Sequence, residues 1–390
     1  MSTISRKPGG ARLAAFILLV VPLAIYLFLY LMPLGSTISL SIDNGEVGRS
    51  LNNFRKADPA DRDAQAVALL TDMQAMERGQ QATVARELNQ ELTGFRSLFL
   101  KTARSANEIE PSAAGLVAFE PRWGEEKYWT TIEGNTSLWT TRHYQEAMGI
   151  KSDANGQLSL TGTDIYLQIM LRTLIIAAQV TFMTLLVGFP LAYAVANGSS
   201  RLAGLVLVVV LMSFWISILV RTTAWVVLLQ TNGLVNSFLL WTGVISQPMQ
   251  LIFNRFGTIV SMTHVLLPFA VIPMMNVMRT IPKSQTDASL SLGAGPIESF
   301  LRVYLPQSFR GIVVGSGTVF ILALGFYITP TLTGGPSDQM IAYYIAEFIN
   351  KTLNWGMAST LSVMLLTMVL VIAGLFGGLR WLMANRRRTA

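Results

Sequence analysis

The 390-residue sequence has no cysteine and only two histidines, His143 and His264. The absence of cysteine excludes disulfides, thiolate zinc sites, iron–sulfur clusters and a cysteine nucleophile. Two histidines are too few for a histidine-rich metal site. The sequence also lacks the G-x-x-x-x-G-K-[ST] phosphate loop, so it cannot bind ATP in the P-loop manner. We therefore expect no catalytic residue, no resident metal and no cofactor in this chain.

Charged residues are scarce as well. They form 13% of the chain, whereas apolar residues form 52%. The charged share is about half of the roughly 25% found in globular proteins. So little charge does not cover the surface of a water-soluble protein of this size, which predicts that lipid covers part of it. The high apolar content also excludes intrinsic disorder, which requires low hydrophobicity.

The charge that is present is divided unevenly. Residues 43–164 hold 13 basic and 18 acidic residues, and the remainder holds 16 basic and 4 acidic residues. In the remainder the basic residues stand singly at the ends of apolar runs, as in membrane proteins whose cytoplasmic loops are positively charged. A nucleic-acid-binding protein would gather them into a patch with polar and aromatic neighbours. We therefore expect membrane lipid, and no nucleic acid, as a partner.

Long apolar runs predict an all-α polytopic membrane protein with six transmembrane helices. A bilayer core of about 30 Å requires about 20 apolar residues in a helix. The first run is longer than the apolar region of a signal peptide and lacks a good cleavage site, so we interpret it as a retained span. Closely spaced Gly311, Gly315 and Gly317 predict that the fifth span packs inside the bundle. The predicted spans cover residues 13–34, 169–196, 202–220, 258–277, 311–332 and 356–379.

The apolar segment 222–253 is ambiguous because Asn232-Gly233 and Gln247-Pro248 interrupt it. Six spans place both basic termini in the cytoplasm, whereas a seventh would put the C-terminal arginines outside. We therefore predict that this segment forms helices at the outer interface, a depth that suits Trp225 and Trp241.

The same parity divides the chain into three parts. Residues 1–35 form a tail and the first span, and residues 36–166 form a large extracytoplasmic insert. Residues 167–390 form a five-helix core with a cytoplasmic loop at 279–310. The sequence thus predicts a multi-pass protein with both termini on the cytoplasmic side.

The insert is expected to contain its own small core. Apolar residues at spacings of four, four, three and four predict a helix over residues 84–99. The second half carries Trp123, Trp129 and Trp139 among prolines and glycines, which favours irregular structure or short strands. The three tryptophans form either a hydrophobic core or a binding surface.

The loop between the fourth and fifth spans predicts two short amphipathic helices with a bend at Gly293-Ala294-Gly295-Pro296. Glycine permits the bend, and proline is favoured at the first position of a helix. Asp287 lies in the first turns of the first helix, where a carboxylate favours the positive end of the helix dipole. Leu305-Pro306 is expected to end the second helix. Such an element is either a docking surface for another protein or an ordinary interfacial connector.

This loop resembles the EAA motif of ABC-importer permeases, E-A-A-x3-G-x9-I-x-L-P. The chain has Asp287-Ala288-Ser289, then Gly293 after three residues and Val303-Tyr304-Leu305-Pro306 after nine more. Residues 214–236 and 328–335 are similar to permeases of spermidine/putrescine-type importers. The resemblance covers residues 167–385 and the first span, and it implies the six-helix fold of type I ABC importers.

The resemblance implies a permease subunit that forms the translocation path for a small organic solute, either a polyamine or a related cation or amino-acid-like compound. The implied partners are a dimer of ATP-binding subunits, a second permease and a periplasmic solute-binding protein, in a bacterial inner membrane. ATP and Mg²⁺ are then used by the ATP-binding subunits. In this family the EAA loop is the coupling helix, and the implied ATPase-coupling residues are Asp287, Ala288, Ser289, Gly293, Leu305 and Pro306.

Two departures from the family bear on the solute, and the first is that the insert between the first two spans is longer than the family's usual loop. Polyamine permeases commonly carry an acidic residue after Ala-Leu-Gly of the fifth span, but Phe326 follows that triplet here. We therefore predict a route lined by polar and aromatic groups. His264 either serves this route or only bonds to a neighbouring helix. Asp338 and Glu347 either attract a cation or only solvate a loop. The predicted substrate-path residues are Trp225, His264, Tyr327, Asp338, Tyr343, Tyr344 and Glu347.

Two other classes of protein remain as alternatives. A secondary transporter or channel would use buried carboxylates as an ion relay, which the predicted spans lack. A membrane-anchored periplasmic sensor shares the order of span, external domain and span. Four further spans and no cytoplasmic signalling domain count against a sensor.

Overall fold

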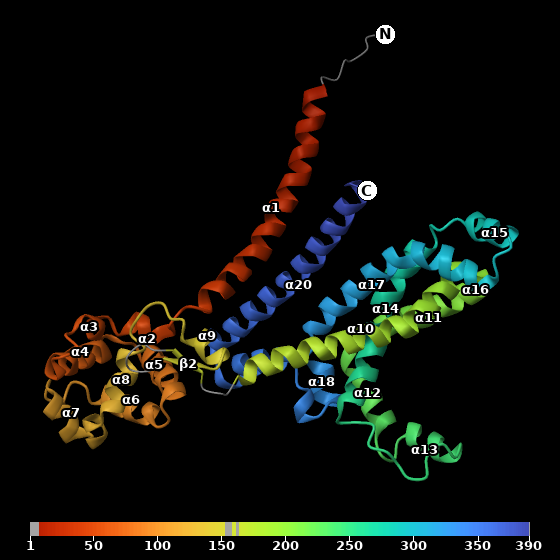
Figure 1. Cartoon of the computed structure of the whole chain (residues 1–390). Helices are drawn as coiled ribbons and strands as arrows, with labels where there is room; N and C mark the ends of the chain where they lie inside the picture. Colours follow the sequence, from red (N-terminus) through yellow and green to blue (C-terminus); the bar gives the residue numbers. More distant parts are fainter. Residues whose placement is uncertain (1–7, 153–157, 161–163, 390) are drawn as a thin grey trace, which may run out of the picture. The chain divides into compact units, whose positions relative to one another are not determined.

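The computed structural model describes residues 8–152, 158–160 and 164–389. The chain divides into two compact units, which we call the insert unit and the bundle unit. The insert unit contains residues 1–159 and 348–366, and the bundle unit contains residues 160–347 and 367–390. Two long helices, α1 (Pro8–Leu40) and α20 (Trp355–Thr389), stand out in Figure 1. Helix α20 begins in the insert unit and continues in the bundle unit.

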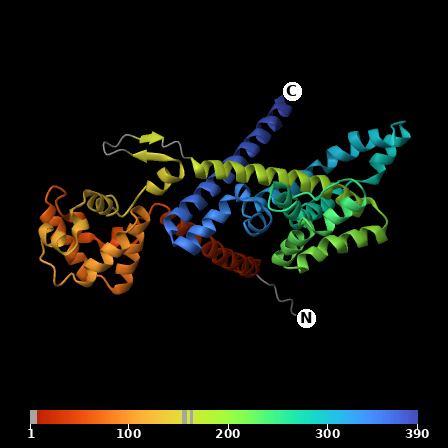
Figure 2. The ribbon, with the colours of Figure 1, turned by 90° about the horizontal axis from the view of Figure 1, so that it is seen from below.

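Short helices make up most of the insert unit. They are α2 (Gly45–Ser50), α3 (Asn52–Lys56), α4 (Arg62–Ala75), α5 (Arg78–Glu91), α6 (Phe95–Arg104), α7 (Ala113–Phe119), the 3₁₀ turn η1 (Pro121–Gly124), α8 (Glu126–Glu133), α9 (Arg142–Ala147) and the π turn η4 (Phe348–Thr352). The strands β1 (Ile150–Ser152) and β2 (Leu158–Leu160) pair in the small sheet that Figure 2 shows.

The core of the insert unit is aromatic. Trp123 and Trp129 are 1% and 2% exposed, and their ring centroids lie 5.3 Å apart. Both indole N–H groups are satisfied, because Trp123 donates to Thr102 Oγ1 at 3.0 Å and Trp129 donates to the Trp123 carbonyl at 2.7 Å. Trp139 is 61% exposed. Of the two alternatives for the tryptophans, the hydrophobic core is confirmed for Trp123 and Trp129.

Two expectations about the insert were wrong in detail. The single helix predicted over residues 84–99 is two helices, α5 and α6, separated at Gly94, whose φ of +93° ends the helical path. The apolar spacing survived this break because Val84, Leu88 and Phe95 face one core. The second half is also more helical than predicted, since Trp123 lies on η1 and Trp129 on α8, although Trp139 forms an isolated β-bridge with Asp43 and the short strands β1 and β2 follow.

Long apolar helices build the bundle unit. Its elements are α10 (Ile165–Asn197), α11 (Ser200–Trp215), α12 (Ile218–Leu229), α13 (Leu234–Trp241), α14 (Arg255–Met278), α15 (Lys283–Ser291), α16 (Pro296–Ser299), the π turn η2 (Phe300–Tyr304), α17 (Leu305–Leu324), α18 (Ile328–Thr333), the 3₁₀ turn η3 (Pro336–Asp338) and α19 (Ile341–Glu347). Helices α10, α14 and α17 pack together around a core of alanine, valine, leucine and methionine side chains.

Glycines bring α17 close to α14. A methyl group placed on Gly311 would lie 3.1 Å from the Met274 Cα, and one on Gly315 would lie 3.1 Å from the Ala270 carbonyl oxygen. Such contacts are too tight for most side chains, so glycine is what permits this helix spacing. The prediction that this span packs inside the bundle is therefore confirmed for Gly311 and Gly315. A methyl group on Gly317 would meet nothing within 4 Å.

Six helical stretches among the described residues are long and apolar enough to cross a membrane, as predicted in number. They are Leu18–Leu40, Ile165–Asn197, Ile218–Trp241, Arg255–Met278, Pro296–Leu324 and Trp355–Leu375.

The predicted third span over residues 202–220 was wrong. Helix α11 ends at Trp215, and α12 begins at Ile218 after two residues with extended backbone. The long apolar stretch therefore lies over Ile218–Trp241, which overlaps most of its length with the segment 222–253 that we expected to lie at the interface. Hydropathy could not locate the break because Ile216 is as apolar as its neighbours.

The predicted fifth span over residues 311–332 was also misplaced. The helix ends at Leu324, and α18 begins separately at Ile328. At the other end, the prediction that Leu305-Pro306 ends a helix was wrong, because α16, η2 and α17 form one continuous apolar helix. The π turn η2 ends at Tyr304, two residues before Pro306. Widening the helix there accommodates a residue that lacks an N–H and clashes with the preceding turn.

Candidate functional site

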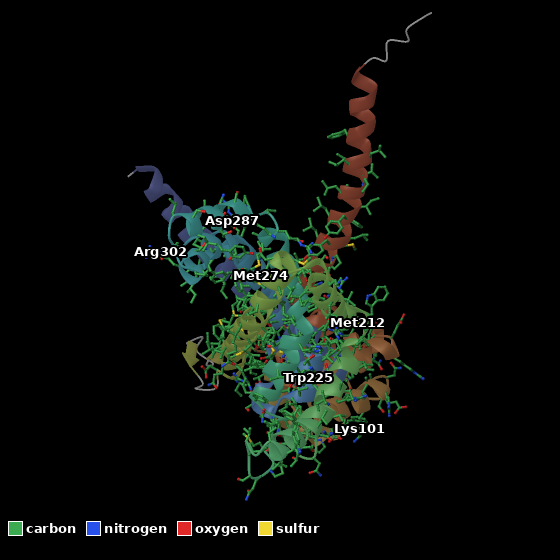
Figure 3. All side chains as sticks on the ribbon, turned by 90° about the vertical axis from the view of Figure 1, so that its right-hand side faces the viewer. Lys101, Met212, Trp225, Met274, Asp287 and Arg302 are labelled. Atoms are coloured by element: carbon green, nitrogen blue, oxygen red, sulfur yellow. The ribbon has the colours of Figure 1, made fainter. Side chains whose placement is uncertain are left out.

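The segment α15–α16 forms the bent element that the sequence predicted. Gly293 follows α15 with a φ of +94°, a left-handed conformation that favours glycine, and its N–H donates to the Leu290 carbonyl at 3.0 Å. Pro296 occupies the first turn of α16. Figure 1 shows α15 and α16 at one end of the bundle unit, and Figure 3 places Asp287 and Arg302 together there. We call residues 283–304 the bent element.

Serine hydroxyls tie the two helices of the bent element together. Ser289 Oγ hydrogen-bonds to Ser299 Oγ, and Ser299 is 4% exposed. The backbone N–H of Ala294 also donates to the Ser289 carbonyl at 3.1 Å. Ser289 stands where the family motif has its second alanine, so this departure supplies a bond across the bend. The element therefore holds its own shape.

The outer surface of the bent element carries exposed apolar side chains. No residue of α15 is buried. Leu292 is 89% exposed and Ile297 is 76% exposed, with the exposed acid Asp287 on the same element. Contiguous exposed apolar residues rimmed by polar groups mark interaction surfaces more often than free ones.

Aromatic rings fasten the bent element to α10, a contact that sequence reasoning missed. Tyr304 packs edge-on against Tyr193 at 5.1 Å, and Phe300 lies 5.7 Å from the same ring. The Asn197 side-chain amide donates to the Tyr304 hydroxyl at 2.6 Å. The available signal was the spacing of four that separates Phe300 from Tyr304 and Tyr193 from Asn197. The bent element is thereby joined to α10.

The structure brings together two of the predicted path residues, Trp225 and His264. The Trp225 Nε1–H of α12 donates to His264 Nδ1 of α14 at 3.1 Å, so the bonded histidine carries its proton on Nε2. Figure 3 shows Trp225 well apart from Asp287 within the bundle unit. Arg221 lies one turn before Trp225, and its buried Nε has no protein partner. The hydrogen bond between Trp225 and His264 thus connects α12 and α14.

The remaining path candidates are spread over α18, η3 and α19. The Asp338 carboxylate is 5% exposed and pairs with Arg255 Nε at 2.7 Å, so its charge is already balanced. Tyr343 and Tyr344 are neighbours with ring centroids 5.2 Å apart. Tyr327 precedes α18 and is 43% exposed, and Glu347 ends α19. Within the described ranges no group of three or more His, Asp or Glu side chains could hold a metal ion.

Known proteins match the membrane part of the chain. Residues 163–386, more than half of the chain, match the family described as "Binding-protein-dependent transport system inner membrane component". The spermidine/putrescine transport system permease protein PotB of Escherichia coli (strain K12) is 30% identical over 202 residues, covering 52% of this chain and 73% of that protein. PotB of Salmonella typhimurium (strain SL1344) is 30% identical over 202 residues, covering 52% and 70%.

Among solved structures, one similar chain comes from a bacterial alginate ABC transporter in complex with an alginate pentasaccharide-bound periplasmic protein. It has a TM-score of 0.44 and 18% sequence identity, and the match covers 70% of this chain and 94% of that chain.

Proposed function

Because the chain belongs to the family of inner membrane components of binding-protein-dependent transport systems, and is thus a permease subunit of an ABC importer, we propose that its bent element couples solute movement to a separate ATP-binding subunit. The observation that carries this proposal is the self-braced helix pair at residues 283–304, whose first helix, α15, has no buried residue. Asp287, Ala288, Ser289 and Gly293 form the contact surface, and Leu305-Pro306 continue it into α17.

The mechanism follows from how the bent element is mounted. Two ATP-binding subunits bind ATP and Mg²⁺ and close, and the groove that holds the bent element moves with them. Phe300 and Tyr304 then pull on α10 through Tyr193, while the continuous helix from Pro296 to Leu324 moves as one body. The free energy comes from ATP, and this chain supplies the bent element, which transmits the motion, and the membrane helices, which open and close the path.

The solute that we propose is a polyamine or a related organic cation or amino-acid-like compound. The support is the similarity to two PotB proteins at 30% identity. Aromatic groups such as Trp225, Tyr327 and Tyr344 can hold an ammonium group through their ring faces. His264, Tyr343, Asp338 and Glu347 complete the proposed path, with Asp338 acting through its pair with Arg255 rather than as a free charge.

The remaining partners follow from the same family. We propose a second permease beside the bundle unit and a periplasmic solute-binding protein on the outer side. Residues 1–35, 36–166 and 167–390 then correspond to the first span, an external insert that contacts the binding protein, and the permease core. Both termini lie in the cytoplasm.

A substitution at Gly293 tests the coupling proposal. Gly293 is exposed, and a methyl group placed on it would meet nothing within 4 Å, so a large side chain changes the docking surface without disturbing the core. Gly293→Arg should insert into the membrane normally and abolish transport-linked ATP hydrolysis in the reconstituted complex. Gly293→Asn is the matched control, because asparagine tolerates the left-handed conformation and is small. Wild-type hydrolysis by Gly293→Arg would refute the proposal.

A further inference from the structure

A cleft lined by several charged and polar side chains lies within the insert unit. It has a volume of about 260 Å³ and is formed by the start of α2, by α5 and α9, and by the residues just before and at the start of α20. Sites for drug-sized ligands are typically about 300–1,000 Å³, so this cleft suits a small solute. Its lining includes Asn44, Arg86, Glu87, Arg142, His143 and Trp355.

Unpartnered polar atoms gather at this cleft. Within the described part of the insert unit, the buried side-chain atoms that lack a protein hydrogen-bond partner are Asn44 Oδ1, Arg86 Nε, Arg142 Nε and His143 Nδ1. All four residues line the cleft. Asn44 and His143 are 6% and 7% exposed. Buried polar groups are nearly always hydrogen-bonded, so four unpartnered polar atoms around one cleft indicate a site for a polar ligand.

Other bonds fix the orientation of Asn44 and Arg142. The Asn44 amide N–H₂ donates to the Asn135 carbonyl at 2.8 Å and to the Ser137 carbonyl at 2.9 Å, which leaves Oδ1 as the acceptor. Arg142 uses its terminal nitrogens on Asn135 and on Glu91, the latter at 3.1 Å, which leaves its Nε–H as a donor. His143 rests on Gly356, where an added methyl group would lie 2.3 Å from Nε2.

The charges of the cleft are close to balance. Four carboxylates and three guanidinium groups line it. Arg49 pairs with Asp43, and Arg142 pairs with Glu91. Burial raises the pKa of the Glu87 carboxyl, which accepts from two backbone N–H groups of α2. A dication or a dianion would upset this balance, whereas a ligand that carries both charges would preserve it.

We propose that this cleft binds a small zwitterionic solute that carries an ammonium and a carboxylate group, such as an α-amino acid. The carboxylate accepts from Arg86 and Arg142, and the ammonium donates to Asn44 Oδ1 and the neighbouring carboxylates. Trp355 supplies an apolar wall. Because His143 contacts Gly356, the occupied cleft is joined directly to the start of the last membrane helix.

Binding by the full-length chain in lipid nanodiscs tests this proposal. Isothermal titration with L-glutamine, putrescine and succinate compares a zwitterion, a dication and a dianion. We expect L-glutamine to bind with a millimolar or lower Kd and the other two to bind at least about tenfold more weakly. No heat from L-glutamine, or tighter binding of putrescine or succinate, would overturn the proposal.

Two arginines of α5 provide a matched pair of variants. Arg86→Gln should weaken L-glutamine binding about tenfold or more, because it removes a charged donor. Arg78→Gln, which changes an exposed arginine on the same helix, should bind as the wild type does. If Arg86→Gln does not fold, Arg86→Lys removes the Nε–H while keeping the charge and should show the same loss. Wild-type binding by a folded Arg86 variant would contradict the assignment.

The outcome is separable from that of the coupling proposal. Gly293→Arg should bind L-glutamine as the wild type does, whatever its effect on ATP hydrolysis, because the bent element lies in the other unit.

Discussion

The two units of this chain solve the packing problem in opposite ways. The insert unit buries large aromatic rings such as Trp123 and Phe95 and covers itself with ion pairs such as Arg122–Glu120. The bundle unit brings helices together at Gly311 and Gly315 and exposes large apolar side chains, such as Leu205 at 63%. The difference is one of solvent, because water drives large side chains inward, whereas in lipid close backbone approach supplies the contact.

The largest difference between the two units is expected from a substitution in the aromatic core of the insert unit. Trp123→Ala should reduce the free energy of unfolding of the insert unit by about 3–5 kcal/mol, because it opens a cavity and leaves Thr102 without its donor. Hydrogen exchange of α6 and α8 in the full-length chain measures this loss, and the membrane helices should keep their protection. Trp139→Ala, at an exposed tryptophan, is the control and should change little. Equal losses from both variants would refute the aromatic-core account.

Acid should weaken the insert unit through His143. Burial lowers the pKa of this imidazole from 6.5 to about 4. Between these values the unfolded chain binds a proton that the folded chain does not, so stability is present above pH 6.5 and falls as the pH drops toward 4. The loss should reach up to about 3 kcal/mol. Unfolding of the wild type and of His143→Gln between pH 7 and pH 4 measures it, and an equal slope in both would contradict this account.

The bundle unit should be destabilised by larger side chains at its helix contacts, whereas the insert unit is destabilised by cavities. Gly315→Leu should lower the free energy of unfolding by about 1–3 kcal/mol and the melting temperature with it, since the side chain has no room against Ala270. Gly317→Leu, two residues further along α17, meets no neighbour within 4 Å at its first carbon and should be tolerated. Melting of the detergent-solubilised variants compares them. A larger loss in Gly317→Leu would reverse the expected order.

The smallest effect is expected at the bend. Ser289→Ala removes the hydroxyl bond to Ser299 and should cost about 1 kcal/mol locally, with faster hydrogen exchange in α15 and α16. Ser291→Ala removes only a hydroxyl bond to the Asp287 carbonyl within α15. It should leave the exchange of α16 unchanged. Identical exchange in both variants would show that the bend is not braced by Ser289.

Sequence patterns located most long helices but not their interruptions. Residues 169–196, 258–277 and 356–379 were found because apolar runs of this length have few other uses. The break between Trp215 and Ile218 and the end of α17 at Leu324 were missed, since extended backbone and helix caps depend on tertiary contacts that hydropathy does not contain. In the insert, the apolar spacing predicted correctly which residues are buried but gave the wrong helix bounds. Two separate helices, α5 and α6, can place their apolar residues in one core at the spacing of a single helix.

The candidate site divides along the same line. Gly293 and Pro296 reveal the bend directly, because each residue type restricts the backbone. The bond between Trp225 and His264 and the ring contact of Tyr304 with Tyr193 join residues 39 and more than 100 positions apart. Sequence alone suggested Trp225 and His264 but could not pair them, and it did not single out Tyr193.

Uphill solute accumulation in proteoliposomes tests the central claim most directly, which is that this chain is a gate driven from outside through its bent element. The chain reconstituted with its second permease and ATP-binding subunits, with ATP and loaded binding protein, should concentrate the solute. The chain alone should not. Accumulation against a gradient by the chain alone would contradict the account.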